Sequence, residues 1–133
     1  MKRILILLLS LPFVLINFQA CAKEPPKEIT CQDVIDAYSQ YEEYSVFHKE
    51  NDHKAHRVCY VEVKEADGDY VYFQFYDTAE HAKEDKRNYN VFVWFLSVLH
   101  GESRWLHTDT YNNISYEYLD KDLMNPFWEL IQA

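Results

Sequence analysis

Three histidines close together in the sequence are the first candidates for chemistry. His48, His53 and His56 lie in or beside a polar segment that also carries Glu50 and Asp52. Imidazole nitrogens and carboxylate oxygens together can bind zinc or copper. The spacing is looser than the paired spacing typical of structural zinc sites, so the alternative is a solvated loop that contains histidine. These histidines are weak candidates for a metal site, and we predict no cofactor.

Catalytic motifs are not found along the chain. The sequence contains no G-x-S-x-G, no H-E-x-x-H, no phosphate-binding loop and no dinucleotide fingerprint. Its two glycines, Gly68 and Gly101, offer few places where the backbone can approach a phosphate. His81, His100 and His107 are scattered, which is typical of surface or helix-end residues. We therefore expect that the protein is not an enzyme.

Tyrosines are the residues best suited to recognition. All 11 lie beyond the apolar start of the chain. Exposed tyrosines give large contact area at low entropic cost and are enriched in protein interfaces. The alternative is that tyrosine simply suits a half-exposed strand. Strand alternation predicts that four tyrosines share one outward face, which we interpret as a binding face: Tyr60, Tyr70, Tyr72 and Tyr76.

The N-terminal stretch has the pattern of a secretion signal. Lys2 and Arg3 form a short basic start, and residues 4–16 form an apolar run interrupted by Ser10 and Pro12. The run has the length of a signal-peptide core and is too short to span a bilayer as a helix.

This stretch ends in Phe18-Gln19-Ala20-Cys21. In this ending the chain resembles the signal peptides of bacterial lipoproteins, whose lipobox closes with a small residue and a cysteine. Ala20 and Cys21 match the pattern, whereas Phe18 and Gln19 depart from the usual residues.

The resemblance implies a lipid-anchored protein on the extracytoplasmic face of the cell membrane. Residues 1–20 would be the signal peptide and 21–29 a lipidated tether. The resemblance covers only this leader, and the length of the remaining chain predicts a single domain over 30–133. Diacylation of Cys21, with palmitate as a typical chain, gives stable attachment. The alternative is cleavage after Ala22, which would release a soluble secreted protein.

The negative charge of the chain excludes some classes of partner. The formal net charge is −9, and it becomes −11 when Lys2 and Arg3 leave with the signal peptide. Such a chain is repelled by nucleic acid and by anionic lipid head groups. We therefore expect no nucleic-acid partner, and a membrane contact only through the lipid on Cys21. The remaining partners are an envelope protein or a cell-wall ligand.

The other two cysteines, Cys31 and Cys59, form an even pair. Outside the cytoplasm such a pair usually forms a disulfide. Closing this loop contributes roughly 3–4 kcal/mol in the chain-entropy model. Buried free thiols are the alternative, and the spacing does not fit a C-x-x-C redox motif.

The spacing of apolar residues along the sequence predicts the helices and strands that position these residues. Thr30 and Asp33 resemble a capping box, and a helical stripe continues to about residue 41. Segments 57–65 and 70–76 predict a hairpin. A three-residue loop, 66–68, with Gly68 left-handed, gives an apolar face and directs Cys59 towards Cys31. The apolar side chains on that face are Cys59, Val61, Val63, Val71, Phe73 and Phe75.

The segment 91–99 is apolar on all sides, which is typical of a buried helix or a buried strand. We favour one long helix over 78–100. Segments 104–110 and 114–119 predict a second hairpin, and a short helix ends the chain. The predicted fold is α+β, a small two-layer sandwich whose antiparallel sheet is built from hairpins, with helices on one face.

These features predict a cell-envelope lipoprotein that acts as a non-catalytic binding or interaction module. The alternative function is a metal-binding or small enzymatic lipoprotein that uses His48, His53 and His56.

Overall fold

The computed structural model describes residues 24–50, 53–66, 68–100 and 106–133. The predicted signal peptide and Cys21 lie outside the described residues. In chain order the elements are α2 (Cys31–Ser39), β1 (Tyr44–Glu50), β2 (Arg57–Glu65), β3 (Tyr70–Tyr76), α3 (Ala79–His100), β4 (His107–Tyr111), β5 (Ile114–Tyr118), the 3₁₀ helix η1 (Lys121–Met124) and α4 (Asn125–Gln132).

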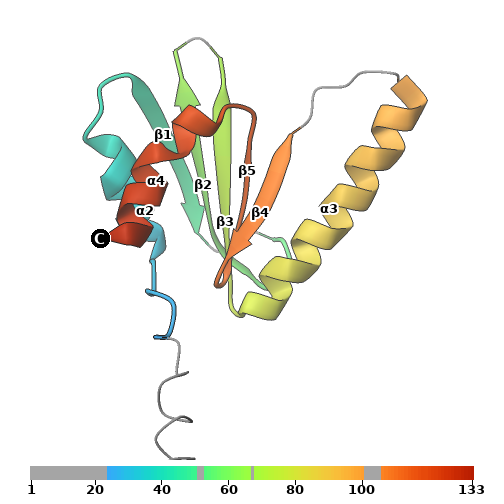
Figure 1. Cartoon of the computed structure of the whole chain (residues 1–133), viewed down its shortest axis with the longest axis horizontal. Helices are drawn as coiled ribbons and strands as arrows, with labels where there is room; N and C mark the ends of the chain where they lie inside the picture. The colour runs from blue at the N-terminus through green and yellow to red at the C-terminus, as the bar shows by residue number, and fades with distance from the viewer. Residues whose placement is uncertain (1–23, 51–52, 67, 101–105) are drawn as a thin grey trace, which may run out of the picture.

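The strands form one five-stranded antiparallel sheet in the order β1-β2-β3-β5-β4. Two hairpins, β2–β3 and β4–β5, lie side by side, and β1 extends the sheet beyond β2 (Figure 1). This arrangement confirms the predicted α+β class with an antiparallel sheet built from hairpins.

The register of the β2–β3 hairpin is the one that strand alternation predicts. Val63 pairs with Val71, and Cys59 pairs with Phe75. Gly68 has φ +100°, a left-handed conformation that residues with a side chain rarely adopt. The apolar side chains therefore share one face of the sheet.

Helices α2 and α4 cover that apolar face. Phe73 of β3 lies 4.9 Å from Phe127 of α4 and 5.7 Å from Tyr38 of α2, measured between ring centroids. The buried Tyr38 hydroxyl donates to the Leu123 carbonyl at 2.7 Å. The core thus lies between these two helices and the sheet.

A disulfide joins α2 to the sheet. Cys31 and Cys59 are bonded, with Cα atoms 6.4 Å apart, which confirms the predicted pair. The capping box at the start of α2 is also present, because Thr30 accepts from the Asp33 amide and the Asp33 carboxylate accepts from the Thr30 amide. Local caps and one covalent link therefore fix how α2 approaches the sheet.

The end of the predicted tether packs against the domain. Ile29 is buried in the core. Lys27 donates to the Leu130 carbonyl of α4 at 3.0 Å, and the Tyr111 hydroxyl donates to the Lys27 carbonyl at 3.0 Å. The contacts of the domain thus include residues before residue 30.

Helix α3 confirms the predicted long helix but lies on the opposite face of the sheet from α2 and α4. Its Asp85 contacts Gln74, whose side chain points away from Phe73 and Phe75. The expectation of helices on one face therefore holds for α2 and α4 only. The physical reason is that α3 presents polar side chains to a polar sheet face.

The segment 91–99 of α3 is helical, and the large apolar side chains whose burial is described there are exposed. Val91, Phe92, Phe95, Val98 and Leu99 are 54–65% exposed, which corrects the expectation of a buried element. In Figure 1, α3 starts beside the lower end of β3 and diverges from the sheet towards its C-terminal end. We call residues 91–99 the apolar end of α3.

Candidate functional site

Two histidines and an aspartate meet where the β2–β3 hairpin joins α3. His56 lies in the turn before β2, Asp77 directly follows β3, and His81 lies in the first turn of α3. The Asp77 amide donates to the His56 carbonyl at 3.0 Å, which ties the two loops together. Thr78 caps α3 by accepting from the His81 amide at 3.2 Å.

The Asp77 carboxylate bridges the two imidazoles. Its Oδ2 lies 3.1 Å from Nδ1 of His56, and its Oδ1 lies 2.6 Å from Nδ1 of His81. The hydrogen bond with His81 lowers the pKa of Asp77, and the hydrogen bond with His56 acts in the same direction. The two imidazole rings are stacked, with centroids 3.7 Å apart and planes 15° from parallel.

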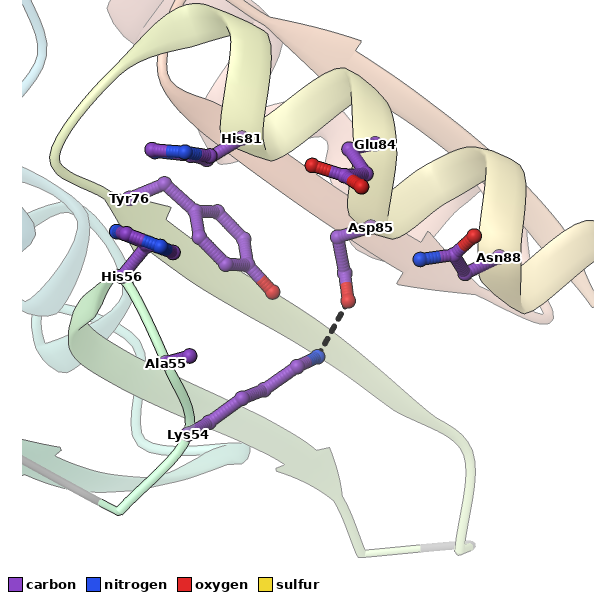
Figure 2. Close-up of a pocket in the computed structure, with 8 residues that line it drawn as sticks. All are labelled: Lys54, Ala55, His56, Tyr76, His81, Glu84, Asp85 and Asn88. Atoms are coloured by element: carbon purple, nitrogen blue, oxygen red, sulfur yellow. Dashed lines mark hydrogen bonds and ion pairs between the residues drawn. The ribbon is translucent and has the colours of Figure 1, made fainter.

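A pocket of about 330 Å³ opens beside this cluster. Figure 2 shows the two imidazole rings on one side of the pocket and the Lys54–Asp85 ion pair on the other, with the ring of Tyr76 between them. Its lining residues are Lys54, Ala55, His56, Tyr76, His81, Glu84, Asp85 and Asn88.

The structure brings together a different set of possible metal ligands from the set that the sequence predicts. Among the described residues, the group with donor atoms close enough to hold an ion is His56, Asp77 and His81, without His48 or His53. His48 lies on the edge strand β1, opposite Val61, and His53 is exposed in the loop that follows. Only one of the three predicted histidines therefore belongs to the cluster.

Histidine spacing alone does not indicate Asp77 or His81, and the isolated position of His81 in the sequence predicts a surface or helix-end residue. The overlooked signal is the Asp77-x-x-x-His81 spacing at a helix start, which places both side chains on one side of the first turn. His56 joins them only through the fold.

A polar layer separates α3 from the sheet. Gln74 of β3 is at its centre: its side-chain oxygen accepts from Lys54 at 2.9 Å and from Arg57 at 2.6 Å. Its side-chain amide donates to Asp85 and to Glu117, each at 3.3 Å. We call Lys54, Arg57, Gln74, Asp85 and Glu117 the polar layer. It explains why α3 faces the sheet with polar residues.

Glu117 is an acid of this layer whose pKa is strongly raised. Its side chain lies on β5 and is 8% exposed. Burial, and to a smaller extent the charge of Asp85, raises the pKa of Glu117 from 4.5 to about 7. Lys54 and a hydrogen bond with Tyr89 act in the opposite direction. This carboxyl group therefore changes charge near neutral pH.

The predicted tyrosine face is present in part. Tyr60, Tyr70 and Tyr72 are half-buried on the sheet face that also carries Gln74 and that α3 packs against. The ring centroids of Tyr60 and Tyr72 are 5.6 Å apart, and those of Tyr70 and Tyr72 are 4.5 Å apart. Tyr76 is only 3% exposed, which removes it from an exposed surface and raises the pKa of its hydroxyl. A binding role for the other three tyrosines stays a prediction.

The apolar end of α3 is the largest exposed apolar group among the described residues. Its exposed side chains are Val91, Phe92, Trp94, Phe95, Leu96, Val98 and Leu99. Elsewhere, Phe47 on β1 and Val58 on β2 are exposed singly. Contiguous patches of this kind mark interaction surfaces in soluble domains, whereas single apolar residues need no explanation.

Comparison of the chain with protein-family models, with curated proteins and with solved structures finds no match. None of the described helices is both long enough and apolar enough to cross a membrane.

Proposed function

We propose that this protein is a non-catalytic interaction module of the cell envelope, anchored through a lipid on Cys21. Its apolar end of α3 docks into an apolar groove of a partner protein. The single observation that carries this proposal is the exposure of Val91, Phe95 and Val98 on a well-formed helix.

The size of the patch supports a protein partner. Seven large apolar side chains are exposed there. At roughly 100 Å² of exposed area for each, they present about 700 Å². One partner contributes about 800 Å² to a protein interface of standard size. The apolar end alone therefore supplies most of one side of such an interface.

The spacing of the patch supports a helix-in-groove mode. Val91, Phe95 and Val98 recur at i, i+4 and i+7, so they share one face of α3. Lys86 and Asn90 point to the sheet instead, where they bond to Asp109 at 2.8 Å and to Thr108 at 2.6 Å. The apolar anchors therefore face away from the domain, as an anchor helix of this mode requires.

Charge supports a partner that differs from this chain. The segment 91–99 carries no charged residue, but the mature chain would carry −11. Two copies would repel each other at this net charge, whereas a groove with a basic rim would attract the domain. We therefore assign the docking surface to an envelope protein with an apolar groove and a basic rim.

The position of the patch supports a partner away from the anchoring membrane. The start of the described chain and the C-terminal end of α3 lie at opposite ends of the domain (Figure 1). Lys27 is bonded to α4, so the short link back to Cys21 spans at most about 21 Å. A lipid on Cys21 would therefore hold the apolar end of α3 away from the bilayer.

Photo-crosslinking in living cells tests this proposal. A photoreactive amino acid replaces Phe95 in one variant and Phe47 in the control, because Phe47 is similarly exposed at 57% but lies on β1. We expect a cross-linked adduct of one defined mass from position 95 and none of that mass from position 47. A homodimer adduct, equal adducts from both positions, or no adduct at position 95 would contradict the proposal.

A further inference from the structure

We propose that His56, Asp77 and His81 form a binding site for a divalent transition-metal ion of the zinc or copper class. Their donor atoms all lie within 4.8 Å of one another, although His56 is distant in the sequence from the segment that carries Asp77 and His81. This site is independent of the docking function, because none of its residues belongs to the apolar end of α3.

The donor set fits such an ion. Two imidazoles and one carboxylate are the ligands that zinc uses in sites with three protein ligands and one open position. Imidazole also suits copper, whereas calcium and magnesium prefer oxygen ligands. His56 and His81 both line the 330 Å³ pocket, which leaves room for water or a small ligand on a bound ion.

The backbone holds the donors together. His56 has φ +65°, a left-handed conformation that is uncommon for a residue with a side chain. The hydrogen bond from the Asp77 amide to the His56 carbonyl fixes this turn against the end of β3. Thr78 caps α3 at the neighbouring position and fixes the first helical turn that carries His81. The cluster is therefore set by backbone contacts and not by its side chains alone.

Binding requires one defined rearrangement. The in-plane lone pairs of two parallel rings cannot converge on one ion, so the stacked imidazoles must open. Ions of this class bind imidazole nitrogen at about 2.0–2.1 Å, which places donors of a tetrahedral site roughly 3.3 Å apart. The side chains of His56 and Asp77 are 53% and 44% exposed, so both can rotate at the surface.

Calorimetric titration of the purified, tag-free full chain with zinc chloride and with copper chloride tests the site. We expect one ion per chain for at least one of the two metals. His56→Gln/His81→Gln should lower the affinity at least about 100-fold, because it removes two ligands. Asp77→Asn should lower it by at least tenfold. His48→Gln/His53→Gln is the matched control and should bind as the unchanged chain does.

The site would be overturned by no binding of either metal, by equal affinity in His56→Gln/His81→Gln and the unchanged chain, or by loss of binding in His48→Gln/His53→Gln. Near-UV circular dichroism of each variant reports whether the fold persists. If His56→Gln/His81→Gln unfolds, the affinity of Asp77→Asn for the metal is the deciding measurement. An unchanged affinity in folded Asp77→Asn would overturn the site. Loss of cross-linking at position 95 leaves this test untouched, so the two proposals fail separately.

Discussion

Gln74 of β3 donates a hydrogen bond from its side-chain amide to Glu117 of β5 at 3.3 Å, and both side chains lie beneath α3. The sheet therefore offers α3 a polar surface, and the apolar side chains of the helix gain nothing by facing it. This relationship explains why α3 is packed through Asp85 and Lys86 while its apolar end is exposed.

Replacing Glu117 by Gln should remove a pH dependence of stability. The folded chain keeps the Glu117 proton up to a pKa of about 7, whereas the unfolded chain releases it near 4.5. The contribution of Glu117 to the free energy of unfolding is therefore fully present below pH 4.5, and it is lost as the pH rises through about 7. At pH 8 we expect Glu117→Gln to be more stable than the unchanged chain, by about 3 kcal/mol at most.

Urea denaturation at pH 4.5 and pH 8 measures this difference. The matched control is Glu80→Gln, because Glu80 is exposed at the start of α3. The control should follow the pH dependence of the unchanged chain. A Glu117→Gln variant with that same pH dependence would refute the raised pKa.

Replacing Asp85 by Asn should shift the titration of Glu117 to lower pH. The negative charge of Asp85 raises the pKa of Glu117, and Lys54 lowers it. Removing the Asp85 charge leaves Lys54 to act without its ion-pair partner, so both changes favour the ionised form of Glu117. Carbon-13 NMR of the glutamate carboxyl groups measures this pKa directly. An unchanged or higher pKa for Glu117 would be inconsistent with the described polar layer.

Removing the disulfide should destabilise the domain substantially. We expect Cys31→Ala/Cys59→Ala to lower the free energy of unfolding by roughly 3–4 kcal/mol, because the loop that the bond closes is long. The bond also fixes α2 over the buried Cys59. Urea denaturation under non-reducing conditions measures the loss. Adding a reductant should shift the unchanged chain towards the variant, and a loss below about 1 kcal/mol would contradict a stabilising role.

The β2–β3 hairpin and the disulfide could be predicted because local patterns specify them. Strand alternation and the left-handed Gly68 select one register, and that register directs Cys59 towards α2. These features depend on residues close in sequence or on one covalent pair. The predicted helix 78–100 follows from the same kind of local signal.

The exposure of 91–99 and the histidine cluster could not be predicted in this way. Hydrophobicity alone indicates burial, and only the pairing of β3 with β5 reveals that Gln74 and Glu117 form a polar surface under α3. Likewise, His56 meets His81 only because the β2–β3 hairpin returns the chain to its starting point. Both features depend on contacts between segments that are distant in the sequence.

Lipid attachment can be tested with Cys21→Ser. We expect the unchanged chain in the membrane fraction of the source cells, labelled by a palmitate analogue. The variant should lose the label and leave that fraction, because stable attachment requires the acyl chains. Detergent phase partitioning with metabolic labelling measures both properties. An unlabelled chain that is already soluble before the substitution would favour secretion after Ala22.

The docking role of the apolar end of α3 is tested most directly by affinity for the partner captured at position 95. We expect Phe95→Asp/Val98→Asp to weaken binding of the purified full chain at least about 30-fold, because charged residues replace two central anchors. Phe47→Asp, an equally exposed control on β1, should bind as the unchanged chain does. Unchanged affinity in a folded Phe95→Asp/Val98→Asp variant would contradict the proposed function.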